Sequence, residues 1–343
     1  MKKLTLLLLT LILALFVACN SDAESGIYSN VADSRESSNV NIFGGYLGNV
    51  GSEYYYLSDE GIVAYKQDNK VIYGHTNDYL IRGASINDSN NLLVLRKIRK
   101  TLKNELWLYS NPTSNSATNI TPTGVEINSL LRCGLFYSAN AVYRYNTSSS
   151  LVELVQDFDP TNIGNTVFYT REAENYALFC VKQANGSYKY YIIKNDGTVD
   201  VTTNNATLTH FVVFQPTSTG NYSLVAYDKG NAIFRGYKAT SGDTKFDNDN
   251  WEMKSYLSKN YSAQAASFYD SSTNSLYIKA SSYFDKVNLS NTNKEVSVER
   301  NDIRTLDIIN ITSCGSYYVA ATHQSLLYKI TVDSNGSTEA EKL

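Results

Sequence analysis

The feature that most constrains the fold of this chain is a pattern of four β-strands that recurs seven times. Each copy has an apolar strand, a turn with Gly or Asn, a second strand, a tight turn, a Tyr-rich third strand and a weaker fourth. The first copy covers Ile42–Leu47, Glu53–Leu57, Gly61–Lys66 and Lys70–Tyr73. The seven copies begin near residues 42, 79, 125, 164, 208, 265 and 306, about 37 to 57 residues apart. A spacing of about 40–50 residues is typical of one four-stranded blade.

The turns between these strands favour hairpins. Asn195-Asp196-Gly197 and Asp228-Lys229-Gly230-Asn231 contain the Asx and Gly residues that adopt positive φ angles in tight hairpin turns. A single four-stranded sheet leaves both of its faces uncovered, whereas sheets stacked around an axis cover one another. We therefore predict an all-β fold over residues 42–343, a seven-bladed β-propeller of four-stranded antiparallel blades. Six or eight blades are also compatible with the uneven spacing, and a β-sandwich is the alternative.

Composition agrees with an all-β chain. There are 28 Tyr but 4 Pro and 2 Met, and Tyr and Thr favour half-buried pleated surfaces while Asn, Ser and Gly populate turns. The repeat resembles WD40-like and related bacterial propellers in its architecture. It lacks their Gly-His and Trp-Asp signatures, and Trp107 and Trp251 do not occupy equivalent repeat positions. Exposed Tyr on loops would supply flat contact area for a protein or sugar partner.

The N-terminus has the pattern of an export signal. Lys2 and Lys3 precede the apolar run Leu4–Val17, which is short for a membrane span. Phe16-Val17-Ala18-Cys19 resembles the lipobox of bacterial lipoproteins. This resemblance implies a signal peptide over residues 1–18, a diacylglyceryl thioether on Cys19, and acylation of its new amino group by a fatty acid such as palmitate. Asn20 stands where Asp often marks inner-membrane retention, so we expect the outer membrane or cell surface. An ordinary secretory signal or an uncleaved anchor helix are the alternatives.

Residues 19–41 read as a lipidated tether, because their polar composition buries little apolar area. Residues 26–31 contain Ile27, Tyr28 and Val31. The residues after Val332 supply a poor outer strand for the last repeat, so we expect residues 26–31 to form a closing strand that pairs with that repeat.

Three cysteines remain once Cys19 carries lipid. Cys180 lies in the middle of an apolar strand and is expected to be buried and inert. Cys133 and Cys314 each precede a glycine at the same point of the repeat, in copies three and seven. Since a disulfide needs Cα atoms about 5.5 Å apart, we expect two free thiols rather than a cross-link.

Charge argues against a nucleic-acid partner. Without residues 1–18 the chain has 28 basic and 33 acidic residues, a net charge of −5, whereas nucleic-acid binding needs clustered Lys and Arg. The one basic run, Arg96-Lys97-Ile98-Arg99-Lys100, is expected to lie on a solvated strand end or hairpin. Contact with anionic lipid or glycan is the alternative.

Metal and catalytic signals are weak. His75, His210 and His323 fall in separate repeats and are expected to be surface or strand-end residues rather than zinc ligands. Carboxylates at Asp243, Asp247, Asp249 and Glu252 around Trp251 leave open whether the loop Asp243–Glu252 binds calcium or is simply solvated. The chain contains no Gly-x-Ser-x-Gly, His-Glu-x-x-His or phosphate-binding glycine motif.

These observations favour an exported, membrane-anchored lipoprotein that acts as a binding or scaffold module for an envelope protein or a glycan. No cofactor and no catalytic residue are expected, and Cys19 is the lipid attachment site. The alternative is a carbohydrate-active hydrolase or lyase with its site at the propeller channel.

Overall fold

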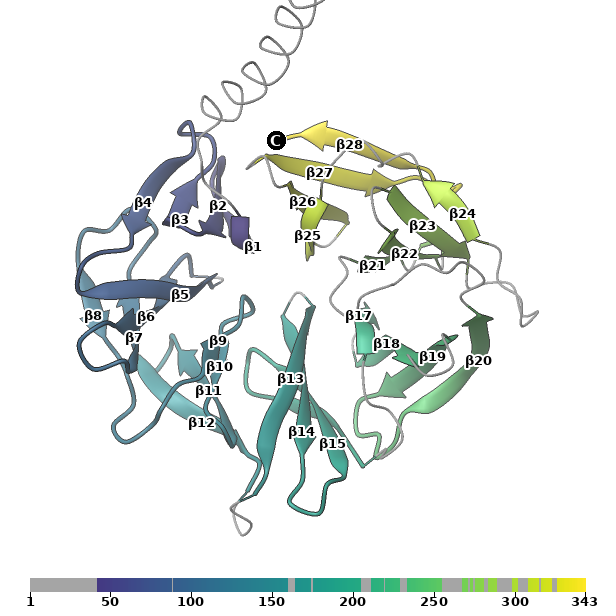
Figure 1. Ribbon diagram of the computed structural model, residues 1–343, viewed down its shortest axis with the longest axis horizontal. Helices are drawn as coiled ribbons and strands as arrows, with labels where there is room; N and C mark the ends of the chain where they lie inside the picture. The colour runs from purple at the N-terminus through teal and green to yellow at the C-terminus, as the bar shows by residue number, and fades with distance from the viewer. Residues whose placement is uncertain are drawn as a thin grey trace, which may run out of the picture.

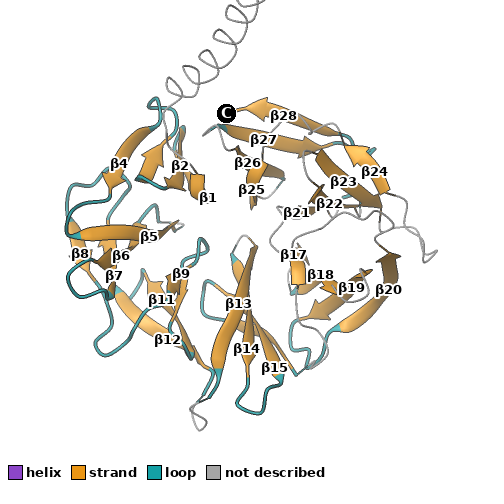
Figure 2. Cartoon of the chain, in the orientation of Figure 1, coloured by secondary structure: helices purple, strands orange, loops and turns teal. Residues whose placement is uncertain are grey.

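The chain is a ring of small β-sheets in the computed structural model (Figure 1). The structure describes residues 42–343 except 88, 160–163, 174, 205–210, 219, 229–232, 255–266, 271, 274, 281–282, 289–297, 302–307, 315 and 323–325. Figure 2 shows strands joined by turns and loops, and no helix occurs among the described residues. Accordingly, no described segment is a helix long and apolar enough to cross a bilayer.

The first four sheets each contain four strands that are consecutive in the chain and antiparallel to their neighbours. Sheet one has β1 (Ile42–Val50), β2 (Glu53–Ser58), β3 (Gly61–Ala64) and β4 (Lys70–Gly74). Sheet two has β5 (Tyr79–Ile86), β6 (Leu92–Ile98), β7 (Asn104–Tyr109) and β8 (Ala117–Asn119). Sheet three has β9 (Ser129–Leu130), β10 (Leu135–Tyr137), β11 (Ala141–Asn146) and β12 (Leu151–Asp157). Sheet four has β13 (Thr166–Ala173), β14 (Tyr176–Lys182), β15 (Tyr188–Lys194) and β16 (Val199–Thr203).

Three more sheets with the same strand order follow within the described residues. Sheet five has β17 (Phe211–Ser218), β18 (Asn221–Asp228), β19 (Ile233–Thr240) and β20 (Asp247–Lys254). Sheet six has β21 (Ser267–Asp270), β22 (Ser275–Ala280), β23 (Tyr283–Asn288) and β24 (Val298–Asn301). Sheet seven has β25 (Ile308–Cys314), β26 (Tyr317–Thr322), β27 (Leu327–Val332) and β28 (Thr338–Lys342). Side chains are described through most of β1–β16 and β25–β28, which make up five of the sheets.

The arrangement is a β-propeller of four-stranded antiparallel blades, which confirms the predicted architecture. The first strand of each sheet lies nearest the axis and the fourth lies outermost (Figure 1). The sheets stand side by side around the axis instead of forming two layers, so the β-sandwich alternative is wrong. The repeat predicted this outcome because each blade buries its faces against the next one, as Leu131 and Phe158 of sheet three do against Phe179 of sheet four.

Middle strands are buried on both faces and outer strands on one. In β14, the five residues from Ala177 to Val181 are buried in succession, whereas β12 contains no fully buried residue. The continuous apolar run of β14 therefore reflects contact with two neighbouring sheets, as in other strands covered on both sides. This position also buries Cys180 completely, so the expectation of a buried thiol is confirmed.

Tyrosines fill the spaces between neighbouring sheets. The Tyr277 hydroxyl in sheet six donates a hydrogen bond to the Gly336 carbonyl in sheet seven at 2.8 Å, and Tyr318 in sheet seven donates to the Tyr269 carbonyl in sheet six at 2.9 Å. A buried Tyr contributes a large apolar ring and needs such a partner for its hydroxyl. Within the described part of the chain, the buried tyrosines are Tyr46, Tyr55, Tyr56, Tyr65, Tyr109, Tyr190, Tyr191, Tyr222, Tyr237, Tyr269, Tyr277 and Tyr318.

The first and last sheets meet. Strand β1 packs beside β25 and β26, and the Asn310 side chain lies where a Cβ on Gly45 would stand, 2.6 Å from its Oδ1. Gly45 also has φ +80°, so a side chain here would meet both a steric and a backbone penalty. The close approach of β1 and β25 therefore depends on this glycine.

The outer position of sheet seven is filled by β28, so the expectation that residues after Val332 form a poor outer strand is wrong. The Asp333 side chain accepts hydrogen bonds from the amides of Asn335 and Ser337, and Gly336 has φ +75°. This turn returns the chain alongside β27, where backbone pairing outweighs the polar composition of β28. The possible closing strand at 26–31 lies outside the described residues, and sheet seven has four strands without it.

The propeller has two distinct faces. We call the side on which each first strand begins the proximal face, and the side on which it ends the distal face. Backbone pairing shows which segments of sheet one lie on the proximal face. Ile42 at the start of β1 pairs with Ser58, and the Glu60 carbonyl in the turn that follows accepts from the His75 amide. The residues before Ile42 therefore join the propeller on its proximal face.

Candidate functional site

The turn that follows β9 is the best-supported candidate site on the distal face. Gly134 has φ +90°, and its amide donates to the Leu131 carbonyl at 3.0 Å, which closes a tight turn around Arg132 and Cys133. The fully buried Ser85, at the end of β5, donates its hydroxyl to the Arg132 carbonyl at 2.7 Å. Sheet two therefore fixes one side of a turn that belongs to sheet three.

Sheet four fixes the other side through Glu172, near the end of the innermost strand β13. One carboxylate oxygen of Glu172 accepts the Arg132 amide at 2.7 Å and the Cys133 amide at 3.4 Å. Protein atoms packed around the carboxylate raise the pKa of Glu172, while the Arg132 charge and the two amides act to lower it. Three neighbouring sheets thus hold one short turn at the distal face.

A group of aromatic side chains lies at the seam between sheets one and seven. The rings of Tyr46 and Tyr54 are 6.2 Å apart, and Tyr54 and Tyr317 are both partly buried against the same core. Burial raises the pKa of Tyr46, as do its neighbours Cys314, Tyr317 and Tyr54, and the Arg132 charge opposes this rise. Arg132 of sheet three therefore lies within electrostatic range of Tyr46 of sheet one.

We call Tyr46, Tyr54, Arg132, Glu172 and Tyr317 the axial cluster. Its members come from sheets one, three, four and seven. Among the described residues, no hydrogen bond or ion pair holds the half-buried Arg132 guanidinium. The cluster therefore combines a cation on a fixed backbone with partly exposed tyrosine rings of other sheets, and these groups are suited to binding a carboxylate or another anionic group.

The predicted cysteines are free thiols at the positions expected. Cys133 and Cys180 are buried, Cys314 is partly exposed, and none of the three forms a disulfide. Burial raises the pKa of Cys133 to about 12 and that of Cys180 to about 12. A thiol with such a pKa is protonated at neutral pH and is a poor nucleophile. Cys19, the predicted lipid attachment site, lies outside the described residues.

Of the three histidines, His75 is the one that lies among the described residues. His75 follows β4, and its Nδ1 accepts the Ile81 amide at 3.0 Å, which confirms a strand-end role. His210 and His323 lie outside the described residues. Across the described segments, no three His, Cys, Asp or Glu side chains are grouped so as to hold a metal ion.

The carboxylates of the fifth repeat are not all in a loop. Strand β20 begins at Asp247, so Asp249 and Glu252 lie in a strand paired with β19. Asp243 precedes this strand, and its carboxylate accepts the Thr240 amide at 2.6 Å. The sequence analysis placed all four carboxylates in one loop, and this placement is wrong for Asp249 and Glu252.

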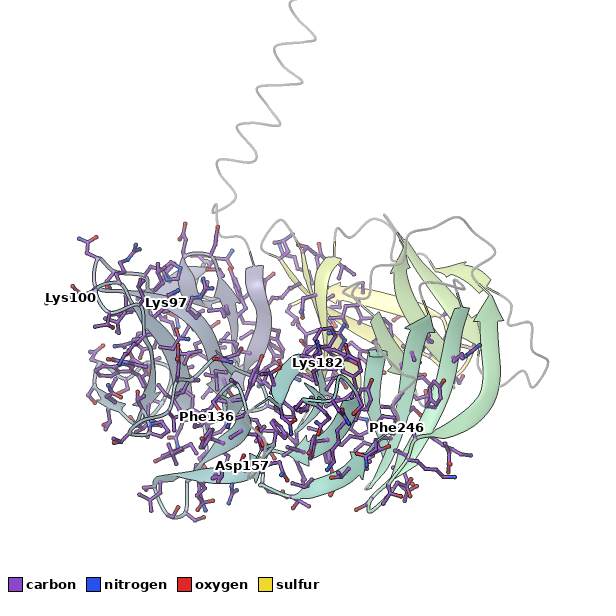
Figure 3. All side chains as sticks on the ribbon, turned by 60° about the horizontal axis from the view of Figure 1, so that its bottom comes forward. Lys97, Lys100, Phe136, Asp157, Lys182 and Phe246 are labelled. Carbon is purple, nitrogen blue, oxygen red and sulfur yellow. The ribbon has the colours of Figure 1, made fainter. Side chains whose placement is uncertain are left out.

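The basic run divides into a buried and an exposed part. Arg96 is 8% exposed, and its guanidinium lies 4.3 Å from the Tyr79 ring centroid, 4.4 Å from Trp107 and 5.5 Å from Tyr109. It also donates to the Tyr109 hydroxyl. The expectation of a solvated run is therefore wrong for Arg96, because the aromatic rings of β5 and β7 enclose it. Arg99 and Lys100 follow in an exposed hairpin turn, as expected, and Figure 3 labels Lys100.

Sequence reasoning missed the axial cluster. Arg132 and Glu172 stand 40 residues apart, in different repeats, and no motif joins them. The available signal was the position of both residues at the end of a first strand, which the repeat alignment places on one face. A surface depression lined by Lys329, Thr331 and Glu339 lies on outer strands of sheet seven, away from this cluster.

Comparisons with known proteins assign no family. No family model matches the chain, and no curated protein does. Among solved structures, PorZ, a surface component of the type-IX secretion system of Porphyromonas gingivalis, is 10% identical over 89% of this chain, with a TM-score of 0.48. The match covers 38% of the PorZ chain. KlHsv2 is 8% identical over 88% of this chain and 98% of its own, with a TM-score of 0.49. The WD40 propeller domain of Doa1 is 11% identical over 87% of this chain and 90% of its own, with a TM-score of 0.44.

Proposed function

We propose that this protein is a lipid-anchored component of a bacterial cell envelope whose propeller binds another envelope protein through the axial cluster. The observation that carries this proposal is the Arg132 turn, which sheets two and four hold from both sides while its guanidinium makes no hydrogen bond or ion pair among the described residues. A cation whose backbone is already fixed loses little conformational freedom on binding.

The side-chain types favour a protein partner over a glycan. Arg and Tyr are enriched among the residues that dominate protein–protein binding energy, and the axial cluster contains Arg132 together with the partly exposed Tyr54 and Tyr317. An acidic side chain of the partner would pair with the guanidinium, and the rings would exclude water around it. A glycan partner would engage the same groups and is distinguished by the test below.

The anchor and the cluster are compatible in their placement. The chain before Ile42 joins on the proximal face, whereas the axial cluster lies on the distal face. If Cys19 carries a lipid, the tether therefore joins one face of the propeller and the axial cluster lies on the opposite face. Asn20 after Cys19 favours display on the outer membrane or cell surface over the inner membrane.

The binding proposal is tested by capture from detergent-solubilised envelope with the intact protein as bait. Arg132→Ala removes the cation while Cys133 and Gly134 keep the turn, and Lys100→Ala removes an exposed cation from the proximal face as the matched control. We expect Arg132→Ala to weaken capture of a specific protein at least tenfold, since truncating a central interface Arg costs about 2 kcal/mol or more. Equal capture by both variants refutes the proposal. Capture that survives protease treatment of the envelope but not glycosidase treatment assigns a glycan instead.

The anchor is tested separately by mass spectrometry of the native protein. We expect an N-terminal Cys19 carrying a diacylglyceryl thioether and an amide-linked fatty acid. An intact Met1, or an unmodified Cys19, refutes lipidation without affecting the binding proposal.

We also propose that the ring contains seven blades. Seven sheets of consecutive strands support this number, as does the packing of β1 beside β25 and β26. The spacing of the repeats in the sequence supports the same number.

A further inference from the structure

The hairpin between β6 and β7 carries a concentrated positive charge. Within residues 97–103, which we call the basic hairpin, four of the seven side chains are cationic and none is acidic: Lys97, Arg99, Lys100 and Lys103. Arg99, Lys100 and Lys103 are exposed, and Figure 3 shows Lys100 at the outer edge of the molecule. The basic hairpin is therefore open to a partner on its solvent side.

Leu102 in this hairpin has two unfavourable features at once. Its φ is +57°, in the left-handed region where Gly or Asn is usual, and its side chain is 69% exposed. The strain is not offset by burial within the propeller, because Leu102 is the most exposed of the large apolar side chains in the described residues. An apolar side chain held outward among cations is the combination that binds a lipid interface.

The basic hairpin lies on the proximal face. The Arg99 amide donates to the Asp78 carbonyl at 2.8 Å, and its guanidinium Nε donates to the Thr76 carbonyl at 3.0 Å. These residues follow His75, which pairs with Glu60 next to the start of β1. The basic hairpin thus shares a face with Ile42, where the N-terminal tether joins.

We propose that the basic hairpin docks on an anionic lipid bilayer, with Leu102 inserted among the headgroups and the cations beside lipid phosphates. This inference rests on the proposed function in one respect, namely that a lipid on Cys19 brings the protein to a membrane. The tether from Cys19 to Ile42 can span up to about 75 Å, and it joins the propeller on the proximal face. Charge complementarity selects the occupant, because each cation near an anionic surface strengthens binding by about fivefold.

Acidic groups on the same face limit the contact to the hairpin. Asp59 and Glu60 are exposed in the neighbouring sheet, and Asp78 is exposed beside Arg99. These carboxylates are repelled by anionic lipid, so the propeller would tilt toward the basic hairpin instead of lying flat. Neutralising the first pair as Asp59→Asn with Glu60→Gln is therefore expected to strengthen binding.

The test is cosedimentation of the chain beginning at residue 20 with vesicles of phosphatidylcholine alone, or with about a third phosphatidylglycerol. This chain lacks the acylated cysteine, so its result is independent of lipidation, and its melting curve is compared with that of the full chain to verify folding. We expect binding to the anionic vesicles that weakens as salt is raised, and little binding to the neutral ones.

Two variants locate the contact. The double variant Lys100→Glu with Lys103→Glu is expected to weaken binding to the anionic vesicles at least tenfold. The variant Leu102→Gly is expected to weaken this binding severalfold. It should also raise the melting temperature, because Gly adopts the left-handed φ without strain. The matched control is Lys66→Glu with Lys70→Glu, two exposed lysines flanking the turn between β3 and β4 on the distal face. Equal binding to both kinds of vesicle, or an equal loss in the two charge-reversed proteins, overturns the proposal. An unchanged affinity of Leu102→Gly overturns the insertion of Leu102.

Discussion

Replacement of Arg96 by alanine should be among the more damaging single changes in the second blade. The guanidinium contacts three aromatic rings and donates to the Tyr109 hydroxyl. A cation over a ring contributes about 0.5–1 kcal/mol at exposed sites and about 2 kcal/mol when desolvated. Truncation would also leave a void between β5 and β7. We therefore expect Arg96→Ala to lower the free energy of unfolding by about 3 kcal/mol.

The assay is urea unfolding followed by tryptophan fluorescence, since Trp107 contacts Arg96 directly. Thermal unfolding should show a decrease of about 6 °C, because about 1 kcal/mol corresponds to about 2 °C in a chain of this size. Arg96→Met should recover about half of the loss: it fills the space, and the Arg96 Nε has no hydrogen-bond partner to lose. Lys100→Ala, in the exposed part of the same run, should stay within about 0.5 kcal/mol. An equally small effect for Arg96→Ala would refute the reasoning.

Two further predictions concern a glycine and the thiols. Gly61→Ala should destabilise the protein by more than about 2 kcal/mol in urea unfolding, because φ is +134° and a Cβ would overlap the Tyr73 carbonyl oxygen. Gly51→Ala, with φ +61° and open space, should cost about 1 kcal/mol, and equal costs would contradict the steric argument. In native protein at pH 8, a maleimide should modify Cys314 rapidly and leave Cys133 and Cys180 protected, because both pKa values are about 12, far above the pH. Rapid modification of all three thiols would show that those two are not enclosed.

The axial cluster shows where sequence reasoning ended. The repeat placed the Arg132 turn and the end of β13 on one face, since both follow innermost strands. It could not show that Glu172 accepts the amides of the neighbouring blade's turn, because that contact depends on the angle between two sheets. The same limit applies to the tyrosines, whose abundance was plain in the sequence while their use between blades was not.

By itself, the sequence determined that the chain would form short antiparallel strands in four-stranded units, because alternating apolar residues and positive-φ turns act locally. It also determined the first-strand starts, which the structure places at Ile42, Tyr79 and, within four residues, at the later blades. Tertiary structure alone decided the surroundings of particular side chains. Arg96 became buried because two strands supply rings on both of its sides, and β20 and β28 became strands because each had a neighbour with unpaired backbone groups.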